Sequence, residues 1–520
     1  MAWLTRMIVF MGFGLVLLGA APGSGSVAMA ADDGAERRPL VVEDFAIINP
    51  RQLGQPIPGP EAGKTQLVPG PEQLFVITPD GALYGMGVNW YGQLGKRDLM
   101  LRDLQLIVPE GVRQVVGEEH TLIVMRDGSL WGMGRNHWGQ LGLGVVEPLQ
   151  RFADKNAAEK PAEQLRPRRI VEKGVVKAAA SQSSSMFLKE DGSLWAMGSN
   201  TDGQLGVGNP GGNAGSNQPH LKKNWFIEGR DEKTPKMVEE DGVVDVAMFR
   251  GVGYYLKEDG SLWVTGLKSV NDQWNPDNQG IGPTRVGDGS IRMAFGDNHH
   301  LVFLREDGTL WGVGQNLLGV FGLGDRKPRS EPTLMAENVV EVDFSQRNFL
   351  AYLDEEGRVW TNKRMVDFRA PESMKPVRME VEDVASISAW STLLMVSDEN
   401  ELFAIGNDTS GQITGVPPGP RNYGGKYFGK PKRPTDDKVQ AAFGNTVATF
   451  WVSPEGQLMT LGWHPRRAMT TPIYYTGKQV SQFPDDTDWL GHDKPRALTV
   501  PAKAEAPSAG DAPAAANQRN

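Results

Sequence analysis

Short apolar runs alternate with turn dipeptides along most of the chain, and this pattern predicts β-hairpins rather than long helices. Thr121–Arg126 precedes an Asp-Gly dipeptide and Leu130–Gly134 follows it. Two apolar runs around Asp-Gly are a strong hairpin signal, because glycine accepts the positive φ of a tight reversing turn. Eight such turns occur, at Asp80-Gly81, Asp127-Gly128, Asp191-Gly192, Asp259-Gly260, Asp307-Gly308, Glu356-Gly357, Glu399-Asn400 and Glu455-Gly456.

The hairpins recur with a period in the forties, as from Gly81 to Gly128, and longer intervals contain insertions. Such a period suits a four-stranded blade of a repeat protein. The insertions are 145–166, 209–236, 268–282 and 416–436. Long loops on a rigid ring are where function tends to lie.

A large side chain follows each turn at a fixed distance of three residues. These side chains are Tyr84, Trp131, Trp195, Trp263, Trp311, Trp360, Phe403 and Met459. Large side chains that recur at one register are packing elements. Burial of each one would stabilise the fold by about 1.5–3 kcal/mol, because it removes apolar surface from water. We therefore expect them between neighbouring blades and not in a ligand site.

The aromatic residue is followed by Gly-x-Asn and then by Gly-Gln-Leu-Gly. The strings are Gly87-Val88-Asn89 with Gly92-Gln93-Leu94-Gly95, Gly134-Arg135-Asn136 with Gly139-Gln140-Leu141-Gly142, and Gly198-Ser199-Asn200 with Gly203-Gln204-Leu205-Gly206. This combination resembles the repeat of the regulator of chromosome condensation family, over roughly Val41 to Phe483. The resemblance implies an all-β fold, a single β-propeller of four-stranded blades. Family precedent favours seven blades, whereas the hairpin count gives eight.

A closed ring removes open sheet edges, so we expect the two chain ends to meet in one blade. Leu40–Ile48 is the candidate closing strand, and Arg496–Val500 is the alternative. The predicted domains are a linker over 31–39, a propeller over 40–500 and a disordered Ala/Pro-rich tail over 501–520.

Residues 1–30 predict an export signal. Arg6 is their only charge, an apolar run follows, and Ala28-Met29-Ala30 fits the small-x-small cleavage pattern. The apolar run is short for a spanning helix, although an uncleaved N-terminal anchor is the alternative. We therefore expect an exported protein, periplasmic or extracellular, without membrane association beyond this signal.

Composition excludes several kinds of chemistry. The 520 residues contain no cysteine, which excludes disulfides, thiolate metal sites and a catalytic thiol. The net charge of −9 argues against nucleic acid as a partner. The seven histidines show no metal-ligand spacing, and His120 and His299, which occupy the same repeat position, are expected to form structural hydrogen bonds. We therefore predict no catalytic residue, no metal and no cofactor.

Aromatic residues between the repeated motifs are the candidate partner-binding residues, together with one histidine. They are Trp90, Tyr91, His137, Trp138, Trp225, Phe226, Tyr423, Tyr427 and Phe428. Tyr and Trp are enriched at interface hot spots. If neighbouring blades present Trp90, Tyr91 and Trp138 together, they form a surface patch. The alternative is that these rings pack beneath their own loops.

Three functions are compatible with these features. The resemblance implies a non-catalytic interaction platform, so the leading hypothesis is an exported propeller that binds an unknown protein. The second hypothesis is binding of a glycan or cell-envelope polymer through the aromatic loops. The third, an enzyme with its site at the channel mouth, has the least support because no catalytic constellation is evident.

Overall fold

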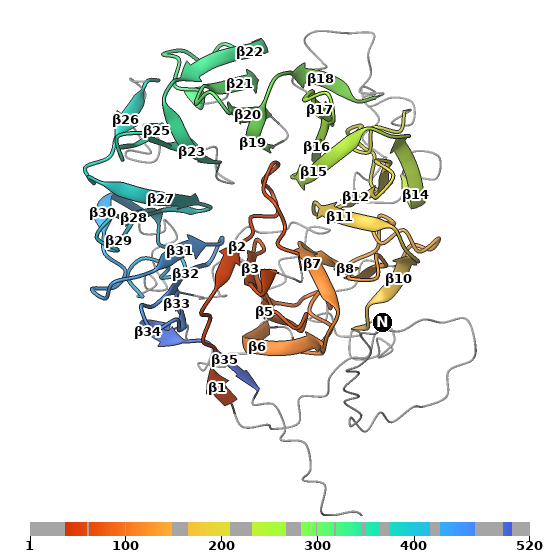
Figure 1. Ribbon diagram of the computed structural model, residues 1–520, viewed down its shortest axis with the longest axis horizontal. Coiled ribbons are helices and arrows are strands. Elements are labelled where there is room, and N and C mark those ends of the chain that lie inside the picture. Colours follow the sequence, from red (N-terminus) through yellow and green to blue (C-terminus); the bar gives the residue numbers. More distant parts are fainter. Residues whose placement is uncertain are drawn as a thin grey trace, which may run out of the picture.

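The chain forms a ring of β-sheets around a central axis (Figure 1). The computed structural model describes residues 37–59, 62–98, 100–147, 165–208, 231–266, 282–297, 299–316, 319–344, 350–362, 374–415, 427–462 and 492–501. These ranges contain strands and turns but no α-helix. The predicted export signal over 1–30 and nearly all of the predicted tail lie outside the described residues.

The first four blades follow one another along the chain. Blade 1 contains β3 (Thr65–Pro69), β4 (Gln73–Ile77), β5 (Leu83–Val88) and β6 (Met100–Val108). Blade 2 contains β7 (Val112–Gly117), β8 (His120–Met125), β9 (Leu130–Gly134) and β10 (Arg168–Val171). Blade 3 contains β11 (Val175–Ala180), β12 (Ser184–Lys189), β13 (Leu194–Gly198) and β14 (Glu232–Glu239). Blade 4 contains β15 (Val243–Phe249), β16 (Val252–Lys257), β17 (Leu262–Thr265) and β18 (Thr284–Gly287).

The second half of the ring repeats this order. Blade 5 contains β19 (Ile291–Gly296), β20 (His300–Arg305), β21 (Leu310–Gly314) and β22 (Arg329–Ala336). Blade 6 contains β23 (Val339–Phe344), β24 (Leu350–Asp354), β25 (Val359–Asn362) and β26 (Pro376–Arg378). Blade 7 contains β27 (Val384–Ala389), β28 (Thr392–Ser397), β29 (Leu402–Asn407) and β30 (Tyr427–Lys432). Blade 8 contains β31 (Ala441–Gly444), β32 (Ala448–Val452), β33 (Leu458–Gly462) and β34 (His492–Ala497).

The predicted β-propeller is confirmed, and the described residues form eight blades. The eight hairpins of the sequence each supply the second and third strands of one blade. The hairpin count of eight is therefore confirmed, and the seven blades that family precedent favoured are not found. Units six and eight, which have no Gly-Gln-Leu-Gly string after Trp360 and Met459, still form complete blades. Hairpin pairing therefore depends on the apolar runs and not on the glycine-rich loop.

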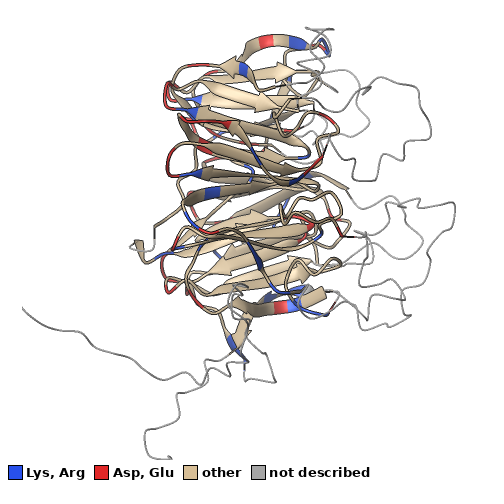
Figure 2. Ribbon diagram, turned by 90° about the vertical axis from the view of Figure 1, so that its right-hand side faces the viewer, with Lys and Arg blue, Asp and Glu red and all other residues tan. Residues whose placement is uncertain are grey.

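The strands run across the thickness of the ring, so their connections gather at two faces (Figure 2). We call one the turn face, because it contains the Asp-Gly turns. Gly128 (φ 77°) and Asn400 (φ 63°) adopt the positive φ that these turns need. We call the opposite face the loop face; it contains the connections from third to fourth strands, such as Asn89–Asp98 in blade 1.

The residue three positions after the turn packs between blades, as predicted. Trp131 is 6% exposed and belongs to a cluster with side chains of blades 1 and 2. Its indole N–H donates to Ser129 Oγ at 2.8 Å, and that hydroxyl donates to Asp127 Oδ1 at 2.6 Å. The same chain of bonds recurs at Trp195, Trp263 and Trp311. The Asp-Gly-Ser/Thr-Leu-Trp string therefore shapes the turn and fixes the indole with one set of atoms.

The Gly-x-Asn and Gly-Gln-Leu-Gly strings hold the loop that follows the third strand. In blade 2, Asn136 Oδ1 accepts the Leu141 N–H at 3.0 Å, and Asn136 Nδ2 donates to the Val145 carbonyl at 2.9 Å. Gln140 Oε1 accepts the Trp138 N–H at 2.9 Å. Blade 1 repeats these bonds around Asn89. The polar residues of the motif thus satisfy backbone groups within their own loop.

Most blades have a proline at the outermost strand, whose outer edge is open to solvent. Seven of the eight outer strands have a proline within them or directly before them, at Pro167, Pro235, Pro283, Pro332, Pro376, Pro431 and Pro495. Proline blunts an exposed edge because it cannot donate to another strand. In β6 this register holds Leu104, and Arg37 Nη2 donates to the Leu104 carbonyl at 2.7 Å.

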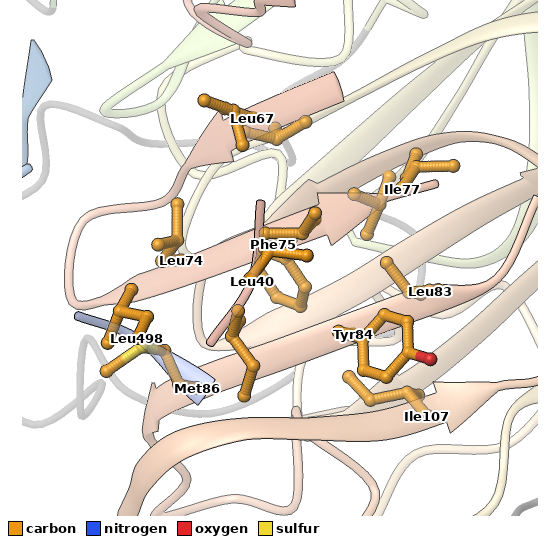
Figure 3. Packing of buried hydrophobic residues seen from close by; sticks show 14 of the residues in the cluster. Leu40, Leu67, Leu74, Phe75, Ile77, Leu83, Tyr84, Met86, Ile107 and Leu498 are labelled. Atoms are coloured by element: carbon orange, nitrogen blue, oxygen red, sulfur yellow. The ribbon is translucent and has the colours of Figure 1, made fainter. Parts of the chain in front are cut away.

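The N-terminal segment closes the ring, but the two chain ends do not complete one blade as expected. β1 (Arg37–Pro39) pairs with β35 (Thr499–Pro501), and β2 (Phe45–Ile47) pairs in parallel with β3. Between them, the Leu40 N–H donates to the Leu498 carbonyl at 2.9 Å. Figure 3 shows Leu40 and Leu498 in the cluster that contains Phe75 of blade 1. The predicted closing strand therefore bridges blades 8 and 1 rather than joining blade 8.

Candidate interaction face and central channel

The loop face brings together three of the predicted partner-binding residues. Arg135 lies between two loops, with its guanidinium carbon 5.1 Å from the centre of the Tyr91 ring of blade 1. Its Nε lies 2.8 Å from His137 Nδ1, and it forms an ion pair with Glu119. The His137 and Trp138 rings are in contact, with centroids 4.8 Å apart. The inter-motif positions of blades 1 and 2 therefore form one cluster.

The exposed fraction of each ring shows whether it is available to a partner or packed within the protein. Tyr91 is 4% exposed and Trp138 7%, while Trp90 is half-buried. Burial and the neighbouring Arg135 lower the pKa of His137 to about 3, so this imidazole is neutral at physiological pH. Tyr91 and Trp138 thus pack beneath their own loops, which is the second of the two interpretations left open by the sequence.

The other predicted residues lie elsewhere. Tyr427 and Phe428 are half-buried on β30, the outer strand of blade 7, and Phe428 packs against the cluster between blades 7 and 8. They are therefore not brought together with the cluster of blades 1 and 2. Trp225, Phe226 and Tyr423 lie outside the described residues.

The central channel contains a segment that sequence reasoning missed. After β2, residues Asn49–Gln55 extend to the middle of the ring (Figure 1). We call this segment the plug. Its own polar groups close it into a compact turn, because the Asn49 N–H donates to Gln55 Oε1 at 2.7 Å and Gln55 Nε2 donates to the Ile47 carbonyl at 2.6 Å.

Arg51 is the centre of the plug and is 3% exposed. Its guanidinium donates to the carbonyls of Phe344 at 2.9 Å and Ala389 at 3.2 Å, and lies 3.4 Å from Asp343 Oδ1. The guanidinium carbon lies 3.8 Å from the centre of the Trp390 ring. Four groups from blades 6 and 7 therefore surround one cation.

The rest of the plug bonds to blades 4 and 5. Leu53 exchanges two backbone hydrogen bonds with Ala294 of β19, at 3.0 and 3.3 Å. The Gly54 N–H donates to Asp245 Oδ2 at 2.7 Å. Gly54 has φ +84°, and a Cβ there would lie 2.1 Å from the Arg292 carbonyl oxygen, so only glycine fits. Tyr254 donates its hydroxyl to the Arg51 carbonyl.

One signal in the sequence could have indicated the channel. Trp390 is the only tryptophan at the turn between the first and second strands of a blade, within the described residues. It departs from the register of the packing tryptophans, so the repeat does not account for its position. The plug itself gives no signal, because Asn49–Gln55 has neither strand alternation nor a motif.

The repeated histidines form hydrogen bonds within the fold, as His120 shows. His120 Nε2 lies 2.7 Å from Ser185 Oγ, and burial lowers the pKa of His120 to about 3. His120 pairs with Gly134 across its hairpin, and the equivalent residue in blade 5 is His300, which pairs with Gly314. The assumed equivalence of His120 and His299 is therefore wrong by one residue, because the turn of blade 5 is one residue longer.

Among the described residues, no three His, Asp or Glu side chains are placed to hold a metal ion. In the same part of the chain, no helix is long and apolar enough to cross a membrane.

Fold and motif together define an eight-bladed propeller built from one repeated hairpin unit. A model of the Regulator of chromosome condensation (RCC1) repeat matches residues 127–188, and a second model with this description matches residues 175–204. Residues 127–204 therefore carry repeats of the regulator of chromosome condensation type.

Similar solved structures are distant. Human WBSCR16 is 20% identical, with a TM-score of 0.45, and the match covers 61% of this chain and 83% of that protein. Prp20p from Saccharomyces cerevisiae is 16% identical, with a TM-score of 0.43, over 71% of this chain and 85% of its own. No curated protein matches the chain.

Proposed function

We propose that this protein is an exported, non-catalytic scaffold that binds another protein through its loop face. The observation that carries the proposal is the division of the ring: the plug fills the channel, whereas the connections from third to fourth strands all begin and end at the loop face. These connections differ most in length between blades, while the strands beneath them repeat. Export is supported by the apolar run and cleavage pattern within residues 1–30.

Glycan binding is the second candidate, since Trp90, Tyr427 and Phe428 are half-buried and keep part of their surface exposed. The burial of Tyr91 and Trp138 reduces the aromatic surface available for sugar stacking. An enzyme at the channel mouth is the least supported alternative, because the buried carboxylate of Asp343 there forms an ion pair with Arg51.

Site-specific crosslinking in the native cell tests the proposal. A photo-crosslinking phenylalanine analogue replaces Trp90 on the loop face, and in a matched control it replaces the exposed Lys173 on the turn face. We expect a protein adduct from position 90 and none from position 173. Adducts with polysaccharide alone would favour the glycan candidate, and equal protein adducts from both positions would contradict use of the loop face.

A further inference from the structure

We propose that the channel contains a binding site for an arginine side chain, which the chain's own Arg51 fills, and that an arginine of a protein partner enters this site when the plug withdraws. The inference rests on the proposed binding of a protein partner and adds the chemistry of that partner. It concerns residues that lie apart from the aromatic cluster of blades 1 and 2.

The site is built for a guanidinium group. Two backbone carbonyls, those of Phe344 and Ala389, accept from its two terminal nitrogens, and Asp343 supplies a negative charge. Trp390 covers one face of the planar group, and Phe249 lies 5.2 Å away. Arginine offers five donors in a plane and stacks on aromatic faces, whereas the ammonium of lysine is a compact charge that cannot match this geometry.

The site is preformed by the blades. Asp343 Oδ2 accepts the Ala389 N–H at 2.7 Å, and Asp343 Oδ1 accepts the Phe344 N–H at 2.7 Å. The first bond joins β27 to β23 and the second lies within β23, so both hold the carboxylate in place independently of the plug. The Trp390 N–H donates to the Thr392 carbonyl at 3.2 Å, which holds the residue in the turn of its own blade. Removal of the Arg51 side chain therefore leaves a shaped pocket rather than a collapsed one.

The plug can leave without opening a blade. None of its residues belongs to the four strands of any blade. Its backbone groups bond to the ring in the Leu53–Ala294 pair, from Gly54 to Asp245, and from Tyr254 to Arg51. Arg51 and Leu53 are buried, but Gly54 is exposed and Gln52 is half-buried, so water reaches part of the segment. Segments with few backbone bonds and partial solvent exposure open locally at low free-energy cost.

The contacts of Arg51 place the site at the loop-face end of the channel. Phe344 and Ala389 are the last residues of β23 and β27, and Trp390 begins the turn that follows. An arginine that approaches from the loop face therefore meets the carbonyls and the indole first. The site is continuous with the face through which the protein is proposed to bind its partner.

Chemical rescue in the full chain tests the site. In Arg51→Ala, millimolar N-ethylguanidinium is expected to raise the melting temperature by several degrees in a saturable way and to change tryptophan fluorescence. N-ethylammonium is the matched control, and wild-type protein should respond to neither compound. No response to N-ethylguanidinium, or an equal response to N-ethylammonium, would overturn the site.

A peptide tests the partner. An acetylated, amidated peptide with the plug sequence Asn-Pro-Arg-Gln-Leu-Gly should bind Arg51→Ala at least tenfold more tightly than the same peptide with lysine in place of arginine. Binding that is equal for the two peptides, or absent for both, would overturn the proposal even if the small cation binds. These tests use purified protein, so their failure is distinguishable from a failed crosslink at position 90.

Hydrogen exchange of wild-type protein keeps the proposal testable if Arg51→Ala does not fold. We expect the Leu53 amide to exchange at least tenfold faster than the Ile123 amide of β8, because the plug opens without the blade. Equal rates for the two amides would mean that the plug leaves only on global unfolding, and the proposal would be wrong.

Discussion

Two buried tryptophans in this ring perform different tasks. Trp131 belongs to a register repeated around the ring, and its environment of Asp127 and Ser129 is repeated with it. Trp390 occurs once, outside that register, and faces the Arg51 guanidinium in the channel. The repeated tryptophans therefore pack the blades, whereas Trp390 contacts the plug, a segment that occurs once.

The two regions also differ in how they are stabilised. The blade interfaces are apolar clusters that join neighbouring blades, as between blades 1 and 2. The channel is held by a buried ion pair and by hydrogen bonds to backbone carbonyls. Apolar burial depends on area, whereas the channel depends on the presence of both charges. Substitutions in the two regions should therefore have distinct signatures.

The largest effect is expected at a blade interface. Trp131→Ala should reduce the free energy of unfolding by about 3–5 kcal/mol, because it leaves a cavity between two blades. Denaturant unfolding measures this loss. Trp131→Phe is the matched control and should cost less, since most of the packed surface remains. An unchanged melting temperature for Trp131→Ala would mean that the interface does not depend on this side chain.

Substitution of Arg51 in the channel should reduce stability less than Trp131→Ala does. Arg51→Ala removes charge-assisted hydrogen bonds and leaves Asp343 buried, with an expected loss of about 2–3 kcal/mol. Arg51→Lys should recover only part of it, because lysine cannot reach both carbonyls and stack on Trp390. Thermal unfolding of both variants tests the geometry, and full recovery by lysine would contradict a guanidinium-specific site.

Backbone conformation gives a sharper test of the plug. Gly54→Ala forces a Cβ against the Arg292 carbonyl and requires a positive φ, with an expected cost of about 2 kcal/mol. Gly63→Ala is the matched control, because Gly63 also has a positive φ (+64°) but has open space around it. It should cost about 1 kcal/mol. Equal losses of stability would show that the plug does not lie against β19.

Loss of the Ser129 hydroxyl, which accepts from the Trp131 indole, should reduce stability less than loss of the indole itself. Ser129→Ala removes the acceptor for Trp131 and the donor to Asp127, and it should cost about 1 kcal/mol. Ser193→Ala, at the same position of blade 3, should have a similar effect. Chemical denaturation of the two variants measures both, and a loss as large as that of Trp131→Ala would reverse the ranking.

The smallest effect concerns pH. Glu118 is buried in the turn between β7 and β8, and this burial raises its pKa to about 8, from an ordinary value of 4.5. Between these values the folded state binds more protons at this carboxyl than the unfolded state, so stability falls as pH rises. From pH 6.5 to 7, the expected loss of stability from this group is about 0.6 kcal/mol. Burial also raises the pKa values of Glu72 and Glu341 to about 7, so Glu118→Gln should reduce the slope of stability against pH without abolishing it, and an unchanged slope would contradict this assignment.

The sequence predicted the ring well because its signals are local and repeated. Asp127-Gly128 and Trp131 act within one hairpin, so spacing alone identifies them. The sequence did not predict the plug, because the contacts of Arg51 lie nearly three hundred residues away in Asp343 and Phe344. It also left the positions of Tyr91 and Trp138 open, because burial depends on Arg135 and the neighbouring loop.

An engineered disulfide tests most directly whether the chain's own plug fills the channel. Leu53 and Ala294 exchange two backbone hydrogen bonds, a geometry with Cα atoms about 5.5 Å apart, which suits a disulfide. Because the natural chain has no cysteine, Leu53→Cys combined with Ala294→Cys adds the only two thiols. The structure predicts a quantitative crosslink under mild oxidation, and none when Leu53→Cys is paired with Lys173→Cys on the turn face. Two thiols at positions 53 and 294 that stay reduced and open to alkylation in the folded protein would contradict the account.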